Sequence, residues 1–400
     1  MVLKAFKFRC FPNKEQQILI RKTFGCARFV FNQLLAEQQE KDRYWLLVHE
    51  MVQNGQLPQN NWRSSFFNKS MNVKKLPPMK EEFSFLKEVD SIALQASVED
   101  LADGFDRFYQ KQNGKPKFKS KKNPVQSYTT KCVNHNIRII DNKIQLPKLG
   151  RIRFAKSREV EGVIKRVTIR QNASGKFFIS VLADVEVIPF PKTNTAIGID
   201  MGLEYFLTTS DGVQIENPRH FAQLEQKLIQ AQRVLSRRIQ LALSKQIPLH
   251  DAKNVQKQRL IVANIHEKIQ NKRQDFLHKW STALVKNHDT ICIEQLQVKK
   301  MMQDQTYAKS ISDVSWSEFF RMLEYKAIWY GKKIIKVDQY FASTQICSCC
   351  GMKNPQTKDT SVRSWTCSTC HAVHSRDKNA AMNLLKEGLR LLTVGTTGLA

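Results

Sequence analysis

Four cysteines near the C-terminal end restrict the fold of this chain more than any other feature. They form two Cys-x2-Cys pairs, Cys347 with Cys350 and Cys367 with Cys370, and 16 residues separate the pairs. Thiolates at this spacing close a tetrahedral site around Zn²⁺, and a site with four protein ligands leaves no position open for a substrate. The sequence therefore predicts a zinc ribbon whose metal is structural.

Other possible donors surround these pairs. Cys349 has the wrong spacing for either pair, so we interpret it as a bystander. His371 and His374 could compete as ligands, but the four cysteines already complete a zinc site. The remaining cysteines are solitary and are expected to be small buried side chains; they are Cys10, Cys26, Cys132 and Cys292.

The charge of the chain indicates a polyanionic partner. Its 64 Lys and Arg residues exceed its 36 Asp and Glu residues, which gives a net charge of +28 over 400 residues. Such an excess is self-repelling unless a polyanion such as nucleic acid neutralises it. Hydrophobic residues make up 42% of the chain, enough for folded cores, so a disordered polycation is excluded.

The densest basic run, residues 111–122, contains six lysines and no acid. Gly114 and Pro116 interrupt any helix there, and we expect the segment to contact phosphate groups. The lysines assigned to this contact are Lys115, Lys117, Lys119, Lys121 and Lys122.

The sequence gives no sign of a membrane partner or of export. No stretch approaches the roughly 18 consecutive apolar residues of a membrane span. Basic residues interrupt each apolar run at the N-terminus, which is unlike a signal peptide. We therefore expect a reducing, cytosolic location. Phosphate-binding loops of the GxxxxGK and GxGxxG types are also absent.

The first half of the chain divides into a helical part and a strand-rich part. Residues 2–11 alternate as a strand, and residues 14–110 are mostly helical, with loops expected at 53–58 and 76–78. Short β-like runs separated by turn residues follow within 126–190; they are IRIID, KIQLP, RIRF, VIKRVTIR and KFFISVLADVEV. This pattern predicts a small antiparallel barrel or sheet.

The sequence of the second half of the chain predicts a strand at 196–200 and a β-hairpin with its turn at Asp211-Gly212. Two long amphipathic helices, a strand at 290–294, a helix containing Trp316 and a strand at 333–337 follow. Basic residues on the outer faces of the long helices are either solvated or bound to nucleic acid; the candidates for binding are Arg237, Arg238, Lys272 and Arg273.

Three acids end or begin these elements. Asp200 and Glu294 each end an apolar strand, and Asp377 lies at the start of a C-terminal helix. Each acid taken alone also has a non-catalytic interpretation. Asp377 could cap its helix, Glu294 could be a solvated strand end, and Asp200 could belong to a turn with Gly202. Together, above one sheet, they fit the carboxylate set of a two-Mg²⁺ phosphodiesterase. The order of elements is the layout of an RNase H-like α/β core, which makes catalytic roles for these three acids our hypothesis.

Several segments then resemble the TnpB family, the RNA-guided nucleases of insertion sequences related to compact type V CRISPR effectors. The resemblance extends over about residues 3–390. Its most specific segments are GIDMGLEYFLTTSDG, ICIEQL, YFASTQICSCCG, SWTCSTC and HSRDKNAAMNLL. By this resemblance, Asp200, Glu294 and Asp377 are Mg²⁺ ligands of a RuvC site, and the two cysteine pairs hold Zn²⁺.

The resemblance also implies a multidomain α+β organisation. Residues 1–10 and 126–191 would form a wedge β-barrel, and residues 11–125 a helical recognition lobe. A RuvC nuclease domain would comprise 192–345 and 372–390, with a zinc-finger insertion at 346–371 and a tail at 391–400.

The partners implied by the resemblance are a guide RNA from the transposon end and double-stranded target DNA, bound by a monomer in a ribonucleoprotein in the prokaryotic cytosol. Gln95 and Asn134 correspond to positions near the short target-adjacent motif.

The implied function is RNA-guided DNA cleavage, and two alternatives remain. A guided repressor with an idle nuclease site is disfavoured, because all three acids are present. An RNA-free transposase or resolvase is the other alternative. A single-strand transposase needs a His-x-His metal pair, which this sequence lacks, and a resolvase would not explain a large basic helical lobe.

Overall fold

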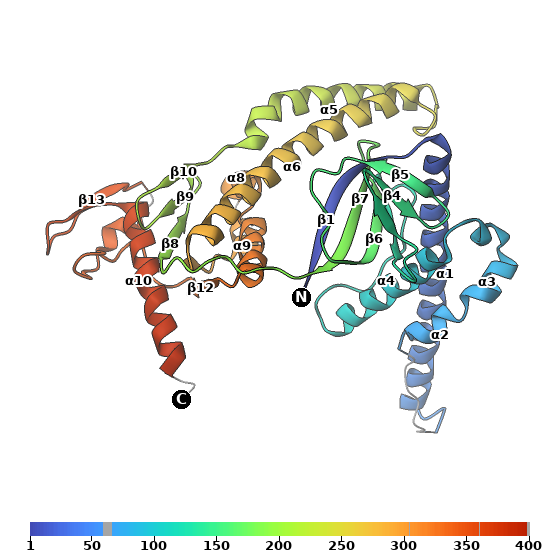
Figure 1. Ribbon diagram of the computed structural model, residues 1–400, viewed down its shortest axis with the longest axis horizontal. Helices are drawn as coiled ribbons and strands as arrows, with labels where there is room; N and C mark the ends of the chain where they lie inside the picture. Colours follow the sequence, from blue (N-terminus) through green and yellow to red (C-terminus); the bar gives the residue numbers. More distant parts are fainter. Residues whose placement is uncertain (59–65, 304, 360, 398–400) are drawn as a thin grey trace. The chain divides into compact units, whose positions relative to one another are not determined.

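The computed structural model describes residues 1–58, 66–303, 305–359 and 361–397 (Figure 1). The chain forms two compact units, Met1–Glu186 and Val187–Ala400. Both contain helices packed on a β-sheet, as expected for a mixed α/β chain. Within the described residues, no helix combines the length and apolar character that a membrane crossing requires.

The first unit is built on a seven-stranded antiparallel sheet, in the order β2-β6-β7-β1-β5-β4-β3. The N-terminal strand pairs with β7 from Val2 opposite Val185 to Cys10 opposite Phe177, and also with β5. Alternate residues of β7 are fully buried, as the alternating sequence predicts. The strands are β1 (Val2–Phe11), β2 (Gln126–Lys131), β3 (Arg138–Ile140), β4 (Lys143–Leu146), β5 (Gly150–Phe154), β6 (Val163–Gln171) and β7 (Phe177–Val185).

One strand of this sheet was absent from the expected runs. β2 has the polar sequence QSYTTK, which carries little of the hydrophobic signal used to find strands. It forms because it pairs with β6 along its whole length and buries Tyr128 and Thr130. Tertiary packing here outweighs the weak local pattern.

The helices of the first unit are α1 (Lys14–Gln53), α2 (Lys69–Val73), α3 (Leu76–Glu82), the 3₁₀ helix η1 (Ser84–Glu88) and α4 (Ser91–Tyr109). Asn13 and Gln16 form a capping box at the start of α1. α1 and α4 share an apolar core that includes Leu34, Leu94 and Leu101. The segment 111–122 is not helical, in agreement with its Gly and Pro residues.

The loop expected at residues 76–78 is wrong. Leu76 begins α3, and Pro77 and Pro78 occupy its first turn. The first amides of a helix have no intrahelical acceptor, so proline is tolerated there and its fixed φ favours the helix.

The second unit contains a five-stranded sheet in the order β10-β9-β8-β11-β12. β8 and β12 run parallel to β11, and β9 runs antiparallel to both β8 and β10. Gly212 has a φ of +92° in the predicted hairpin turn. The strands are β8 (Ala196–Met201), β9 (Tyr205–Thr209), β10 (Gln214–Glu216), β11 (Thr290–Glu294) and β12 (Lys333–Val337).

Figure 1 shows α5 (His220–Ser244) and α6 (Lys253–Asn287) running side by side as a long helical hairpin. The remaining elements of this unit are α7 (Val298–Met301), α8 (Gln305–Val314), α9 (Trp316–Tyr330), the 3₁₀ helix η2 (Pro355–Lys358), a two-stranded ribbon of β13 (Ser364–Thr366) and β14 (Val373–Ser375), and α10 (Arg376–Thr397).

Helices cover both faces of the central strands. Ile197 and Ile199 of β8 share an apolar core with α6 and α9, which contribute residues such as Leu284 and Phe319. Gly198 lies between these two isoleucines, so it points to the opposite face, where α10 packs. A Cβ atom built on Gly198 would lie 2.0 Å from the carbonyl oxygen of Ala381 in α10.

The expected tail at 391–400 is largely helical. α10 continues through Thr397, and residues 398–400 lie outside the described part of the chain. Once a helix is nucleated on a core, each further residue adds a backbone hydrogen bond at small cost, so no separate packing signal is needed in the sequence.

Candidate functional site

Two of the three predicted acids lie side by side on neighbouring strands. β8 and β11 are parallel, with Ile199 opposite Ile293, so Asp200 and Glu294 follow at matching positions. Two residues before each acid, Gly198 and Cys292 both face α10. Because a strand alternates its faces, both carboxylates project toward the side on which α10 packs.

The third acid comes from the first turn of α10. Asp377 follows Arg376, the first residue of this helix. The helix is held close to the sheet at two glycines: a Cβ on Gly198 would overlap Ala381, and a Cβ on Gly388 would lie 2.3 Å from Sγ of Cys292. This close approach sets the position of Asp377 relative to the sheet.

The three acids interact electrostatically. Burial raises the pKa of Asp200 well above its usual value, and the charges of Asp377 and Glu294 raise it further, while Arg376 acts in the opposite direction. Burial also raises the pKa of Glu294. Carboxylates that disfavour one another's ionised form gain stability from a bound cation.

The spread of the three carboxylates differs from that of the cysteine cluster. Among the described residues, the groups whose ligand atoms all lie within 4.8 Å of one another are cysteine-based, and the three acids do not form such a group. The donor set is the hard oxygen type that Mg²⁺ prefers.

Arg363 is a site residue that the sequence did not identify. It precedes β13, in the segment between the cysteine pairs, and its guanidinium lies 3.9 Å from Oδ1 of Asp377 and 3.2 Å from Oε2 of Glu204. A single arginine in a chain with many basic residues has no distinguishing pattern. Only the folding of the ribbon onto α10 places it beside the acids.

The four predicted zinc ligands are brought together. Their sulfur atoms all lie within 4.8 Å of one another. Sγ of Cys347 is 3.6 Å from Sγ of Cys370, and Sγ of Cys350 is 3.6 Å from Sγ of Cys367. Sulfurs at about 2.3 Å from a tetrahedral zinc are about 3.8 Å apart, so these side chains fit Zn²⁺ with little movement. Backbone N–H groups of Cys370 and Thr369 lower the pKa of Cys367 to about 6, which favours the thiolate.

A second possible donor group shares Cys347. The ligand atoms of Cys347, Cys349 and His374 also lie within 4.8 Å of one another. Nε2 of His374 is 3.0 Å from Sγ of Cys347, and its ring packs on Trp365. An imidazole N–H at this distance donates to a zinc-bound thiolate, which would make His374 a support for a ligand.

The cysteine cluster and the acid site are joined through α10. The side chain of Asn379 accepts a hydrogen bond from the backbone N–H of Ser348 (2.8 Å) and donates one to the carbonyl of Ile346 (2.7 Å). Asn383 also donates to Ile346. The first cysteine knuckle is therefore tied to the helix that carries Asp377.

The candidate nucleic-acid residues are distributed over both units. Lys115 pairs with Asp42 at 2.6 Å, and Arg273 pairs with Asp313 at 2.8 Å with little exposure, which is typical of a structural ion pair. Gln95 is half-buried on α4. Arg238 is half-buried, and the exposed candidates are Lys115, Lys117, Lys119, Lys121, Lys122, Asn134, Arg237 and Lys272.

Family models match much of the chain. One described as "Probable transposase" matches residues 179–305, and one described as "Cas12f1-like, TNB domain" matches residues 316–384. A "Helix-turn-helix domain" model matches residues 1–41, although in this structure they form β1 and most of the single helix α1.

Two curated relatives match nearly the full length of this chain, and a third matches part of it. A Streptomyces pristinaespiralis protein named "Putative RNA-guided DNA endonuclease" is 33% identical over 401 residues, covering 98% of this chain and 91% of the relative. The similarly named InsQ of Escherichia coli K12 is 32% identical over 412 residues, covering 98% of this chain and 94% of the relative. "TnpB-like protein L79" of Acanthamoeba polyphaga mimivirus is 28% identical over 244 residues, covering 58% of this chain and 45% of the relative.

The chain belongs to the TnpB family. The family resemblance inferred from the sequence motifs is thereby confirmed. In this TnpB protein, the matched C-terminal region contains the cysteine cluster, Arg363 and Asp377.

Proposed function

We propose that this TnpB protein is an RNA-guided DNA endonuclease of an insertion sequence. It would cleave target DNA beside a short target-adjacent motif by Mg²⁺-dependent phosphodiester hydrolysis. The observation that carries the proposal is the convergence of three carboxylates: Asp200 and Glu294 end neighbouring parallel strands on one side of the sheet, and the charges of Glu294 and Asp377 both raise the pKa of Asp200. The names of the full-length relatives support the same activity.

In this proposal, the three acids act as one catalytic site. Asp200, Glu294 and Asp377 would together hold the Mg²⁺ ions. Mg²⁺, when bound, supplies an activated water and stabilises the leaving oxygen. Arg363 lies where its guanidinium can leave Asp377 and pair with the scissile phosphate, because arginine binds phosphate in a bidentate manner.

The order of the five-stranded sheet, with α6 and α9 on one face and α10 on the other, supports an RNase H-like RuvC core for residues 192–345 and 372–390. We assign residues 346–371 as the zinc-finger insertion, with Cys347, Cys350, Cys367 and Cys370 as structural ligands. The sheet that joins β1 to strands of 126–185 supports a wedge domain, and α1–α4 would form the recognition lobe.

The partners follow from charge. A guide RNA hybridised to target DNA would neutralise the net charge of +28 across both units. We propose a monomer in a ribonucleoprotein in the prokaryotic cytosol, with Gln95 and Asn134 near the target-adjacent motif. The exposed lysines of 111–122 would contact the phosphate backbone.

The experiment that tests the function is isolation of the protein expressed beside its native flanking DNA. We expect one defined RNA to copurify, and ribonuclease treatment to abolish sequence-directed cutting of double-stranded DNA. A heterogeneous RNA mixture, with directed cutting unchanged after RNA removal, would instead favour an RNA-free recombinase. Directed binding without any cutting would favour the repressor with an idle site.

A further inference from the structure

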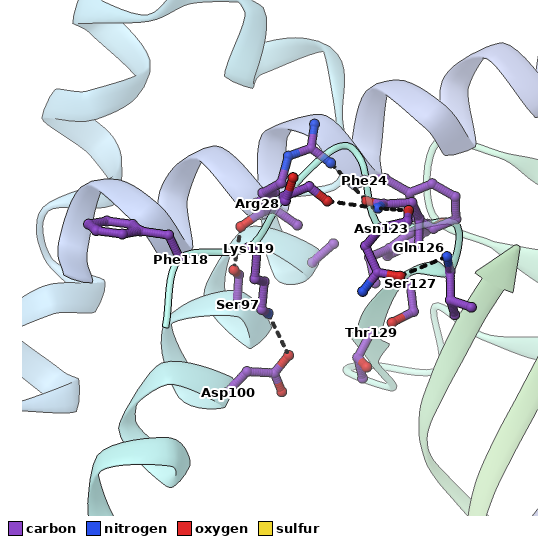
Figure 2. A pocket seen from close by; sticks show the side chains of 15 residues that line it. Phe24, Arg28, Ser97, Asp100, Phe118, Lys119, Asn123, Gln126, Ser127 and Thr129 are labelled. Carbon is purple, nitrogen blue, oxygen red and sulfur yellow. Dashed lines mark hydrogen bonds and ion pairs between the residues drawn. The ribbon is translucent and has the colours of Figure 1, made fainter. Parts of the chain in front are cut away.

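A cavity of about 380 Å³ lies within the first unit, at the place where α1, α4, β2 and the loop between α4 and β2 meet (Figure 2). Its size falls in the range of about 300 to 1,000 Å³ typical of small-ligand sites. None of its residues belongs to the acid site or to the cysteine cluster. Its polar lining residues include Arg28, Asp100, Lys119, Asn123, Ser127 and Thr129.

Two charged side chains lie next to each other on the cavity wall. Figure 2 shows Lys119 reaching from the loop toward Asp100 on α4, and Nζ lies 3.9 Å from Oδ2. Both side chains are nearly half exposed, 44% and 47%. A long and exposed pair of this kind contributes little stability by itself, so both groups are open to a ligand.

Hydrogen bonds between the Lys119 backbone and the Asn32 side chain fix the position of this lysine. Its N–H donates to Oδ1 of Asn32 (2.8 Å) and its carbonyl accepts from Nδ2 of the same residue (2.9 Å). The ammonium lies 3.9 Å from the ring centre of Phe31. These contacts hold the lysine at the cavity wall before any ligand arrives.

Asp100 lacks donors. The structure records no hydrogen bond to its carboxylate within the described residues, and the ion pair with Lys119 is long. Desolvation by the surrounding protein raises the pKa of Asp100, the positive charges of Lys119 and Arg166 lower it, and the negative charges of Asp103 and Glu99 raise it. A ligand that brings N–H donors could therefore pair with this half-exposed carboxylate.

The opposite wall is preformed. Nε2 of Gln126 donates to the carbonyls of Ser120 (3.1 Å) and Asn123 (2.7 Å), and Nη1 of Arg28 donates to Oε1 of Gln126 (2.8 Å). The loop is thus tied to α1 and to the first residue of β2. Figure 2 shows Ser127 and Thr129 across the cavity from Asp100.

The surroundings indicate the class of ligand. Lys117, Lys121 and Lys122 are exposed on the loop that forms the cavity wall, so the mouth attracts phosphate. The carboxylate inside would repel a phosphate and accept hydrogen bonds instead. A nucleotide satisfies both requirements, because its phosphates can stay at the basic mouth while its base enters.

We propose that this cavity binds an unpaired guanine nucleotide of the nucleic acid that the protein carries. The proposal rests on the proposed function. The pairing edge of guanine presents O6, N1–H and N2–H₂ in a row. Lys119 can donate to O6 while Asp100 accepts from both N–H groups. Each other base offers the carboxylate only one ring or amino position, so guanine gains one extra charge-assisted hydrogen bond.

The test is photocrosslinking with the full-length protein. A uridine hexaribonucleotide with one 6-thioguanine, which keeps N1–H and N2–H₂, is irradiated with the protein, and mass spectrometry locates the adduct. Unlabelled hexamers with guanine, inosine, adenine or uridine at that position then compete. We expect adducts on the loop 118–127, and guanine to compete about tenfold better than inosine, which lacks the amino group.

The variants separate base reading from general attraction. Asp100→Asn should abolish the preference for guanine over inosine. The matched control Asp106→Asn removes the same charge from an exposed position of α4 that does not line the cavity, and it should keep the preference. Lys119→Gln should weaken the binding of both the guanine and the uridine hexamers, because both lose the attraction of the ammonium charge. The guanine hexamer should also lose its O6 contact.

Adducts outside this cavity, or equal competition by guanine and inosine on the wild-type protein, would overturn the proposal. So would an unchanged preference in Asp100→Asn. A guanine deoxyhexamer that competes as well as the ribohexamer would assign the bound strand to DNA, and weaker competition would assign it to RNA. These binding measurements need no cleavage, so a failure of guided cutting would be seen separately.

Discussion

Gly198 of β8 lies against Ala381 of α10 so closely that a single added methyl group would meet the Ala381 carbonyl at 2.0 Å. The same methyl group would lie 2.7 Å from the backbone nitrogen of Leu385. Both obstacles are backbone atoms, which cannot rotate away. The contact therefore defines how near the helix with Asp377 can approach the strand with Asp200.

We expect Gly198→Ala to destabilise the protein by about 1 to 3 kcal/mol or more, because α10 must shift away from the sheet. Cleavage should also fall, since the shift separates Asp377 from Asp200. Denaturant unfolding and a cleavage assay measure the two effects. The matched control is Gly114→Ala, whose added methyl group would have no heavy atom within 4 Å. Equal effects of the two substitutions would contradict the role of the contact.

Local patterns in the sequence were sufficient to find most elements near the acids. AIGID and TICIE are short apolar runs that each end in one carboxylate, and the alternation of a strand then places Asp200 and Glu294 on one face. The cysteine pairs are likewise a local spacing. Each of these signals lies within a few residues of chain.

What the sequence did not reveal depends on contacts between distant segments. Arg363 reaches Asp377 only because the ribbon folds back on α10, and Asn379 is recognisable as a link only when its partner Ser348 is known. β2 was missed because its burial comes from β6 and α4, not from an apolar pattern of its own. The start of α3 at Leu76-Pro77-Pro78 was misjudged because proline was read as a helix breaker and not as a first-turn residue.

The three acids should behave as one unit. Asp200→Ala and Glu294→Ala should each lower cleavage by about a thousandfold or more, with nucleic-acid binding retained. The double variant should be no worse than either single variant, because the loss of either acid already disables the site for the two Mg²⁺ ions. Substantial cutting by Asp200→Ala would place the catalytic site elsewhere.

The cysteine cluster should hold one zinc ion per chain. Cys367→Ser should lose the metal and destabilise the C-terminal part, because three thiolates and one hydroxyl bind Zn²⁺ far more weakly. Cys349→Ser should keep it. Elemental analysis and cobalt substitution, which reports the number of thiolate ligands by its spectrum, measure the outcome. Equal zinc loss in both variants would show that the group of Cys347, Cys349 and His374 takes part in binding.

Lys326 gives the second unit a pH-dependent stability. This residue is 5% exposed, and its ammonium donates to the carbonyl of His278 (2.9 Å) and to the hydroxyls of Ser281 and Thr282 (2.7 Å each). Burial lowers its pKa from 10.5 to about 8. Between these two values the unfolded chain binds more protons than the folded chain, so stability rises with pH.

We therefore expect the free energy of unfolding of the wild type, relative to that of Lys326→Met, to increase by about 1 to 3 kcal/mol from pH 8 to pH 10.5. Urea unfolding at several pH values measures this difference. The control Lys333→Met changes an exposed lysine, and its difference from the wild type should stay flat. A flat difference for Lys326→Met as well would mean that the ammonium is not the titrating group.

The link between the cysteine knuckle and α10 predicts that damage at one site reaches the other. Asn379 is 1% exposed, and its replacement by alanine leaves the N–H of Ser348 without its acceptor, while Ile346 keeps only the bond from Asn383. An unpaired buried amide costs about 1 to 3 kcal/mol. We expect Asn379→Ala to speed zinc release to a chelator and to raise the Mg²⁺ concentration needed for cleavage, because Asp377 lies two residues away on the same helix. Arg390→Ala, at an exposed position of α10 where the side chain pairs with nearby Glu387, is the matched control and should change neither quantity. If Asn379→Ala released zinc faster but left the Mg²⁺ dependence unchanged, the two sites would be independent in spite of their shared helix.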